Sequence, residues 1–394
     1  MIKFNSDTEI KRLDHRLIYY CLLAIFFFLP LATSPAVIAS SLAIGIWLIS
    51  GSFIRDRHKW IRQNWTIPVT AFMILTIIGL LWTNNMTYGL EIVSKSRYWL
   101  LAFIVASLPT NEKIFRQYIT AFVAGLLVLS AFSILTYSGF VSTATKLPTI
   151  FSGKSITASL FLVLGILFLS FEYKLHNQLK HRLIIISLIF ILFFALSICG
   201  GRIGHVAFIL LSPWVIFNML KDKGILKISL LYIISVALLM ASPTVQERAC
   251  LAVKNIEDNE INSSIGIRLH QWESGIKIFT KNILLGVGSG SYSTAMTDYK
   301  KPGMDPININ PPHPHNSYIY IGASYGITGL MIFLWLVYTI IKNGWNKRIS
   351  ILGQSIIGYS LIFCIGSLTD TLILSVSHAP LLALLTGIGT KENE

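Results

Sequence analysis

The residues best suited to chemistry stand between two long apolar stretches of the chain. His313 and His315 alternate with prolines in the run 311–316 (PPHPHN). A histidine at a polar surface accepts a proton near neutral pH, and Asn316 is a candidate for orienting it or a substrate hydroxyl. The sequence offers no Ser-His-Asp pattern and no glycosidase-like pair of carboxylates, so hydrolysis is not favoured. No cysteine or second cluster accompanies the histidines, and we expect neither a metal ion nor any other cofactor.

Two arginines are candidates for binding an anion. Arg202 stands in the run 199–204 (CGGRIG), a glycine-rich break between apolar runs. A charge near membrane depth costs about 2.5–3.5 kcal/mol, so it is usually paired or functional, although an interfacial arginine on a lipid headgroup is the alternative. Arg268 flanks the apolar face of a helix, where an ordinary surface charge is the simpler interpretation. Together they suit a diphosphate, because each guanidinium can bind phosphate oxygens at two points.

The region around Arg268 has the pattern of an amphipathic helix. Apolar residues recur at steps of three and four, which predicts a helix lying on the membrane surface or against other helices. The predicted buried face consists of Ile265, Leu269, Trp272, Ile276, Phe279 and Ile283. Ser263 is among the candidates for the N-cap of this helix.

A glycine run follows this helix at 285–292 (LGVGSGSY). Backbone N–H groups in such a run can bind phosphate, but its spacing does not match a dinucleotide fingerprint. A plain turn is the simpler interpretation of this run.

The elements that must position these residues are apolar helices. The chain has 394 residues, of which 54% are hydrophobic and 13% charged, whereas soluble domains carry about 25% charged residues. We therefore expect an all-α polytopic membrane protein, with about twelve spans of roughly 20 residues each. The predicted spans are 17–33, 36–54, 66–82, 98–108, 118–137, 156–171, 183–199, 203–220, 225–241, 316–341, 351–368 and 371–389.

Charge distribution predicts the orientation in the membrane. The net charge of +14 comes mainly from Lys and Arg in connections on one side, which indicates cytoplasmic loops instead of nucleic-acid binding. Both termini are then cytoplasmic. The parts are residues 1–241 with nine spans, a periplasmic loop at 242–315, and residues 316–394 with three spans and a short tail. Lys95 and Arg97 fall on the outer side, near the predicted site.

The motif around His315 resembles that of bacterial O-antigen ligases. His315-Asn316, nine further residues and then Gly326-Ile327-Thr328-Gly329 match the signature H-[NSQ]-x9-G-x-x-G of that family. The predicted arrangement of spans, with one large outer loop between the ninth and tenth, resembles the family as well. Parts of this signature are shared across the wider superfamily of O-antigen ligases and polymerases.

The resemblance implies a glycosyltransferase of the bacterial inner membrane with its site facing the periplasm. Such an enzyme moves O-polysaccharide from undecaprenyl diphosphate to the lipid A–core, with inversion and without a metal. Its catalytic residues would be Arg202, Arg268 and His315, and Gly326 and Gly329 would be its motif glycines. We add as candidate substrate-binding residues Asn316, His313, Lys95 and Arg97. Asp370 also lies on the outer side, where no motif assigns it a role.

Other functions remain open from the sequence. An O-antigen polymerase or a protein O-oligosaccharyltransferase would keep the same donor and change the acceptor. A transporter of lipid-linked glycans would suit a protein of many spans, but few ionisable residues lie within them. The expected partners are the carrier-linked polysaccharide, the lipid A–core and membrane lipids.

Overall fold

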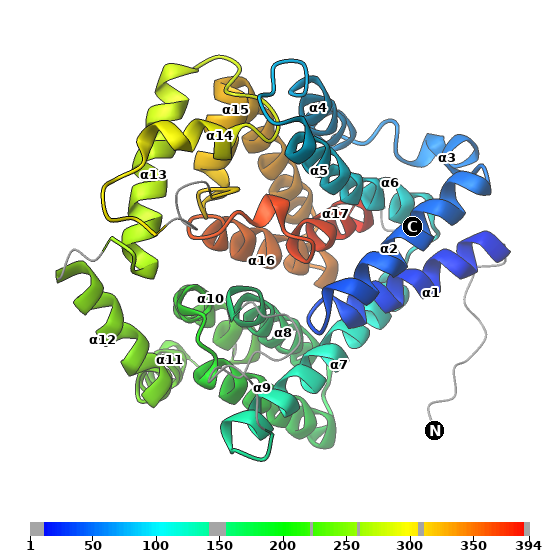
Figure 1. The fold of residues 1–394 in the computed structure, drawn as a ribbon. Helices are drawn as coiled ribbons and strands as arrows, with labels where there is room; N and C mark the ends of the chain where they lie inside the picture. Colours follow the sequence, from blue (N-terminus) through cyan, green and yellow to red (C-terminus); the bar gives the residue numbers. More distant parts are fainter. Residues whose placement is uncertain (1–11, 142–154, 221–223, 258–260, 306–310, 390–394) are drawn as a thin grey trace.

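The computed structural model describes residues 12–141, 155–220, 224–257, 261–305 and 311–389, and these ranges contain helices and no strand (Figure 1). The two chain ends, which we expect in the cytoplasm, lie outside the described residues. The helices are α1 (Leu13–Phe28), α2 (Thr33–Ile49), α3 (Ser52–Arg55), α4 (Thr66–Ile78), α5 (Met86–Ser96), α6 (Leu100–Ser107), α7 (Glu112–Tyr137), α8 (Ser155–Leu175), α9 (Leu179–Ile198), α10 (Arg202–Leu220), α11 (Ile225–Met240), α12 (Pro243–Glu257), α13 (Ser264–Lys281), α14 (Tyr292–Met296), α15 (Ser317–Asn346), α16 (Ile351–Gly366) and α17 (His378–Ile388). Short 3-10 helices occur at Arg57–Lys59, Arg97–Trp99, Thr297–Tyr299 and Leu372–Leu374.

Among the described residues, five helices are long and apolar enough to cross a bilayer: α7, α8, α9, α10 and α15. The pair α11 and α12, bent by 72°, counts as a sixth if it forms one broken span. A helix overlaps each predicted segment, but α1 has 16 residues, α2, α4, α16 and α17 have 10–17 residues, and α6 has eight. At about 1.5 Å per residue these are shorter than the apolar layer of about 30 Å, so helix length does not confirm about twelve spans.

Two predicted spans differ from the structure in particular. The segment 98–108 contains only the short α6, which continues from α5 through the 3-10 helix Arg97–Trp99. The segment 371–389 begins with the 3-10 helix Leu372–Leu374 and becomes α-helical only at His378. Both segments were predicted from their apolar composition. Composition alone does not indicate where the hydrogen bonding of an α-helix begins or ends.

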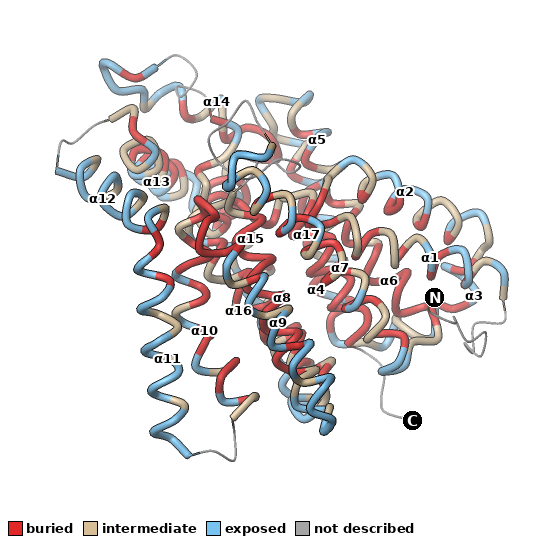
Figure 2. Tube along the Cα trace, turned by 90° about the horizontal axis from the view of Figure 1, so that it is seen from below, coloured by how far each residue is buried: buried red, intermediate tan, exposed pale blue. Residues whose placement is uncertain are grey.

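Helix α8 forms the centre of the bundle, since 83% of the residues in its most apolar 18-residue stretch are buried. It packs against α9, α10 and α16. Small residues allow these contacts: a methyl group at Gly204 would meet Ser159 Cβ at 2.2 Å, and one at Gly358 would meet Leu167 Cδ2 at 2.1 Å. Helix α11, in contrast, has only Leu239 buried (Figure 2), as expected for a helix that faces lipid.

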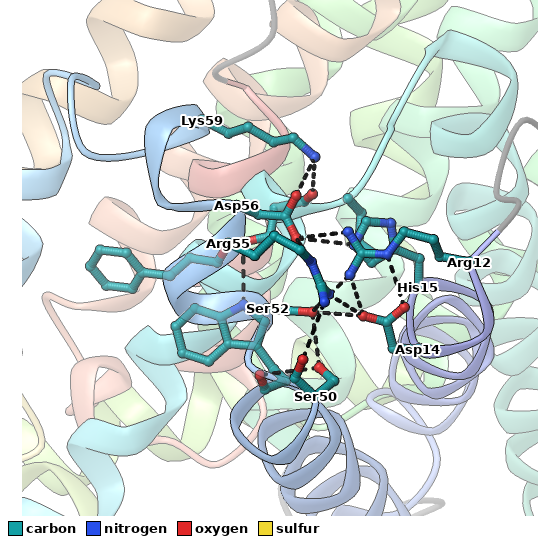
Figure 3. Close-up of polar contacts among 12 residues, drawn as sticks. Arg12, Asp14, His15, Ser50, Ser52, Arg55, Asp56 and Lys59 are labelled. Carbon is teal, nitrogen blue, oxygen red and sulfur yellow. Dashed lines mark hydrogen bonds and ion pairs between the residues drawn. The ribbon is translucent and has the colours of Figure 1, made fainter.

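A network of ion pairs joins α1 to the connection after α2 (Figure 3). Asp14 accepts from Arg55 at 2.6 Å and from Arg12 at 2.5 Å, and Asp56 lies 3.0 Å from Lys59. Lys59 also donates to the carbonyl oxygen of Ser107 at the end of α6. The network therefore holds three separate segments together at one end of the bundle.

Helix α15, which follows the histidine motif, is broken at Gly326. Its backbone there has φ 66° and ψ −160°, a conformation outside the helical region. The glycine run inserts at this break: the N–H groups of Val287 and Gly288 donate to the carbonyls of Ala323 and Ser324 at 3.0 and 2.9 Å. The N–H of Ile327 in turn donates to the carbonyl of Ile283 at 2.7 Å.

Candidate functional site

His315 lies where the loop enters α15, and its backbone is strained. It has φ 49°, and it is the one non-glycine residue with positive φ in the part of the chain that the structure describes. Such a conformation costs about 1–3 kcal/mol and persists where the surroundings enforce it, often at functional sites. Its side chain is 39% exposed, so the imidazole is open to a substrate while being fixed from behind.

Asp370 fixes the imidazole. Its Oδ1 lies 3.1 Å from His315 Nδ1 and also accepts the backbone N–H of Thr371 at 2.8 Å. Burial alone would raise the pKa of this carboxyl, but the hydrogen bond from His315, the charges of His315 and His313 and the Thr371 N–H outweigh it and lower the pKa to about 2. A carboxylate at this place accepts Nδ1–H, which leaves the Nε2 lone pair of His315 free to take a proton.

Asn316 is the N-cap of α15. Its Oδ1 accepts the backbone N–H groups of Tyr318 and Ile319 at 2.9 and 3.0 Å, and its Nδ2 donates to the carbonyl of Leu368 at 2.9 Å. These contacts tie the start of α15 to the end of α16, where Asp370 follows. They give Asn316 a role in holding His315 and Asp370 together.

His313 lies beside His315, with the two ring centroids 4.7 Å apart and the rings nearly perpendicular. The segment between them is held by Trp272 of α13, whose indole N–H donates to the carbonyl of Pro314 at 3.0 Å. Ligand atoms of His313, His315 and Asp370 lie within 4.8 Å of one another, so these residues could hold a metal ion. The same geometry serves equally as an Asp370-oriented histidine.

Both predicted arginines belong to this neighbourhood. Arg268 of α13 is partly buried, and burial lowers its pKa, while the charge of Asp370 acts in the opposite direction. Arg202, the first residue of α10, donates to Ser264 Oγ at 3.0 Å, and its charge interacts with those of Arg268 and Arg248. The cationic group therefore contains Arg248 of α12 in addition to the two arginines chosen from sequence.

Glycines let α10 place Arg202. A methyl group at Gly201 would meet Ser159 Oγ at 2.3 Å and the carbonyl oxygen of Ser155 at 2.4 Å. The start of α10 therefore lies directly on the start of α8, which leaves the Arg202 side chain to reach α13.

Lys95 and Arg97 have partners on their own segment. Lys95 pairs with Glu91 at 2.8 Å, and Arg97 donates to Ser94 and stacks over the ring of Tyr98 at 5.1 Å. Among the described residues, the hydrogen bonds and ion pairs of His315, Asp370 and Arg202 involve neither of them. Electrostatic interactions link Arg202 to Arg268, and link Arg268, His313 and His315 to Asp370, whereas the interactions of Lys95 and Arg97 are with their own segment.

The predicted amphipathic helix is α13, capped by Ser263, whose Oγ accepts the N–H of Gly266 at 3.0 Å. Of the two predicted positions, on the membrane surface or against other helices, the exposure of its apolar residues favours the first. Leu269 and Ile276 are 54% and 51% exposed, while the buried residues are His270, Gln271, Ser274, Gly275 and Ile278. A methyl group at Gly275 would meet Ile319 Cγ2 at 2.4 Å, so small residues allow α13 to approach α15 and its apolar face points outward.

The glycine run has a structural role, because it packs and hydrogen-bonds against α15. Gly286, Gly288 and Gly290 all have positive φ, and a methyl group at Gly286 would meet the backbone of Ser324 at 2.3 Å. The N–H groups of 287, 288 and 289 already donate to carbonyls of α15 and of Gly79. They are not available to bind phosphate, which supports the interpretation as a turn.

Sequence reasoning gave no role to Asp370 and did not consider Arg248. Asp370 carried one signal, as an acidic residue standing alone between two apolar stretches. Arg248 lies in α12, the first helix of the long loop. Its electrostatic interaction with Arg202 depends on where α12 lies relative to the other helices, which the sequence does not indicate.

Apolar helices and a cluster of arginines and histidines near their ends indicate a helical membrane protein with a polar site at these helix ends. A comparison with family models matches residues 186–334 to the family described as O-antigen ligase. The matched region contains Arg202, Arg268 and His315, and over these residues the chain is similar to the O-antigen ligase family, whose proteins are membrane enzymes of the glycosyltransferase type. A comparison with curated proteins gives no match.

Proposed function

We propose that the chain is an O-antigen ligase, which transfers O-polysaccharide from undecaprenyl diphosphate to a hydroxyl of the lipid A–core in the periplasmic face of the inner membrane. The observation that carries this proposal is the pair His315–Asp370 at 3.1 Å, with the charge of Arg268 acting on the same carboxylate. A base beside a cationic anion-binding group is what the transfer of a glycan from a diphosphate requires.

In the proposed reaction, Arg202 and Arg268 bind the diphosphate of the donor. Nε2 of His315 takes the proton of the acceptor hydroxyl. At the same time the oxygen of that hydroxyl bonds to the anomeric carbon of the donor glycan, from the side opposite the diphosphate. The bond between that carbon and the diphosphate oxygen breaks, and the carrier diphosphate leaves with the electron pair and inversion at the carbon. Asp370 stabilises the imidazolium that forms, and the arginines stabilise the charge on the departing diphosphate.

The test is transfer by purified protein in detergent with carrier-linked glycan and lipid A–core, followed by lipopolysaccharide gel electrophoresis. We expect His315→Ala to abolish the ladder of capped lipopolysaccharide while the variant keeps the thermal unfolding midpoint of the native protein. A normal ladder from well-folded His315→Ala would contradict the proposal. Transfer in detergent, where no gradient exists, would also exclude a transporter as the sole function.

A polymerase or a protein O-oligosaccharyltransferase would use the same residues, and the family match does not distinguish them. Deletion of the gene separates the first of these from a ligase. Loss of a ligase leaves polymerised glycan on the carrier lipid, whereas loss of a polymerase leaves lipopolysaccharide with a single repeat.

A further inference from the structure

A groove with both polar and apolar lining residues lies at the end of the bundle away from the candidate site. Helices α7, α8 and α9 enclose an open groove of about 770 Å³. The apolar lining residues are Ile119, Val123, Ala124, Leu127, Leu169, Ile185 and Leu188, and the polar ones are Glu112, Lys113, Arg116, Gln117, Thr120, Glu172 and His176. The polar residues belong to the start of α7 and the end of α8, so the groove has a polar mouth and an apolar interior.

The position of this groove separates it from the candidate site. Arg202 lies beside the start of α8, against Ser155 and Ser159, whereas the groove uses residues of the last turns of α8. Helices α7 and α9 close it at depth, because a methyl group at Gly165 would meet Leu126 Cδ1 at 2.4 Å and Leu192 Cδ1 at 2.9 Å. The groove therefore opens toward the end of the bundle opposite Arg202.

The outer wall of the groove faces the lipid. On α9, which is long and apolar enough to cross a membrane, the side chains of Leu183, Ile186 and Phe190 are 54%, 42% and 65% exposed. A groove that opens between two such helices, polar at one end and apolar along its length, has the amphipathic profile of a membrane lipid lying parallel to them.

Charge at the mouth favours an anionic headgroup. Arg116 forms a two-point ion pair with Glu172, and His176 lies 3.7 Å from the same carboxylate. Glu172 is thereby paired with Arg116, while Lys113 forms no salt bridge within the described residues. Glu112 also lines the mouth and acts electrostatically on Arg116. Arg182 donates to the carbonyl of His176 at 2.6 Å and adds a cation at the rim, so the carboxylates of Glu112 and Glu172 are outnumbered by the cations Lys113, Arg116 and Arg182.

We propose that this groove binds an anionic glycerophospholipid of the surrounding bilayer, with its phosphate at Lys113 and an acyl chain against Val123, Ala124 and Leu188. The inference goes beyond glycan transfer and does not depend on it. The excess of one cation over the carboxylates at the mouth favours a negatively charged headgroup over a zwitterionic one, and the apolar interior excludes a free phosphate as the natural occupant.

The test measures lipid binding to the delipidated full-length protein by native mass spectrometry. Phosphatidylglycerol and phosphatidylcholine with the same acyl chains are titrated in parallel. We expect tighter binding of phosphatidylglycerol and about ten-fold weaker binding of it to Lys113→Glu, since one charge-assisted hydrogen bond is worth about a factor of ten. Ala124→Phe fills the groove and should weaken binding of both lipids.

Matched controls keep the result specific. Lys342→Glu makes the same charge change on α15, and Val128→Phe adds the same ring to α7 at a residue that does not line the groove. Both should bind phosphatidylglycerol as the native protein does. The proposal is overturned if Lys113→Glu binds as tightly as the native protein, or if Lys342→Glu loses as much affinity as Lys113→Glu. Should Ala124→Phe fail to fold, the exposed Lys113→Glu still decides the question.

Discussion

At the scale of the residue, the candidate site depends on how one imidazole is held. His315 has a strained backbone, and its Nδ1 is bonded to a carboxylate whose pKa is about 2. Asp370 is therefore ionised at physiological pH. It orients the imidazole of His315 and stabilises the charged form of that ring. The sequence motif contains His315 and does not contain this partner.

We expect Asp370→Asn to lower kcat by about two to four orders of magnitude with little change in KM, because an amide can favour the wrong tautomer of His315. The measurement is the rate of glycan transfer at several donor concentrations. Asp298→Asn, on the surface of the long loop, is the control and should retain native activity. Equal losses of kcat in the two variants would assign Asp370 no special relation to His315.

At the scale of the element, the break in α15 explains why the motif needs glycine at 326. The backbone there has φ 66°, and a methyl group would meet the carbonyl carbon of Leu284 at 2.4 Å. The break frees carbonyls that accept hydrogen bonds from the glycine run, so the loop and α15 lock together. This docking also fixes where α13 and Arg268 sit relative to His315.

Gly326→Ala should destabilise the fold by about 1–3 kcal/mol, since it forces an alanine into a left-handed conformation against backbone. The thermal unfolding midpoint of purified protein measures this change. Gly322→Ala is the matched control on the same helix, where the nearest atom to a new methyl group lies at 3.3 Å and the backbone is helical. A midpoint for Gly326→Ala as high as for Gly322→Ala would disprove the docking.

The ion-pair network at the start of α1 makes a prediction about acid stability. Burial tends to raise the pKa of Asp14, but hydrogen bonds from Arg12 and Ser52 lower it to about 2 from 3.8. A carboxyl with a lowered folded-state pKa stabilises the protein above pH 4, and this stabilisation is lost as pH falls from 4 toward 2. In thermal unfolding, Asp14→Asn should lower the midpoint at pH 7 and should reduce the difference between pH 7 and pH 3.

At the scale of the whole molecule, the site is assembled from five separated parts: the start of α10, α12, α13, the start of α15 and the residues after α16. The polar end that carries Arg202 and His315 and the groove that carries Lys113 lie at opposite ends of the bundle. The orientation predicted from charge then puts the candidate site outside and the groove toward the cytoplasm.

Cysteine labelling tests this orientation. Cys250 on α12 is exposed, whereas Cys199 is buried. A membrane-impermeant maleimide should label native Cys250 in intact spheroplasts, and in a Cys250→Ser background it should label Lys342→Cys only after lysis. Labelling of Lys342→Cys before lysis, with Cys250 protected, would reverse the predicted topology.

The sequence by itself determined much of this protein, because apolar stretches and glycine spacing follow from local chemistry. It predicted a helix overlapping each apolar segment and the amphipathic α13 with its Ser263 cap. It also named Arg202, Arg268 and His315, of which the two arginines interact with each other and Arg268 and His315 each interact with Asp370. The helix ends and the number of crossings were less predictable, since the apolar segments at 98–108 and 371–389 are interrupted by 3-10 turns.

Only the tertiary structure decided which residues share a site. Asp370 lies 55 positions after His315 and meets it because Asn316 and the end of α16 join two helices. Leu269 and Ile276 of α13 face outward because Gly275 and Ser274 allow close packing against α15. Periodicity predicts that a helix has an apolar face, but whether protein or membrane covers that face depends on the shape of the neighbouring helices.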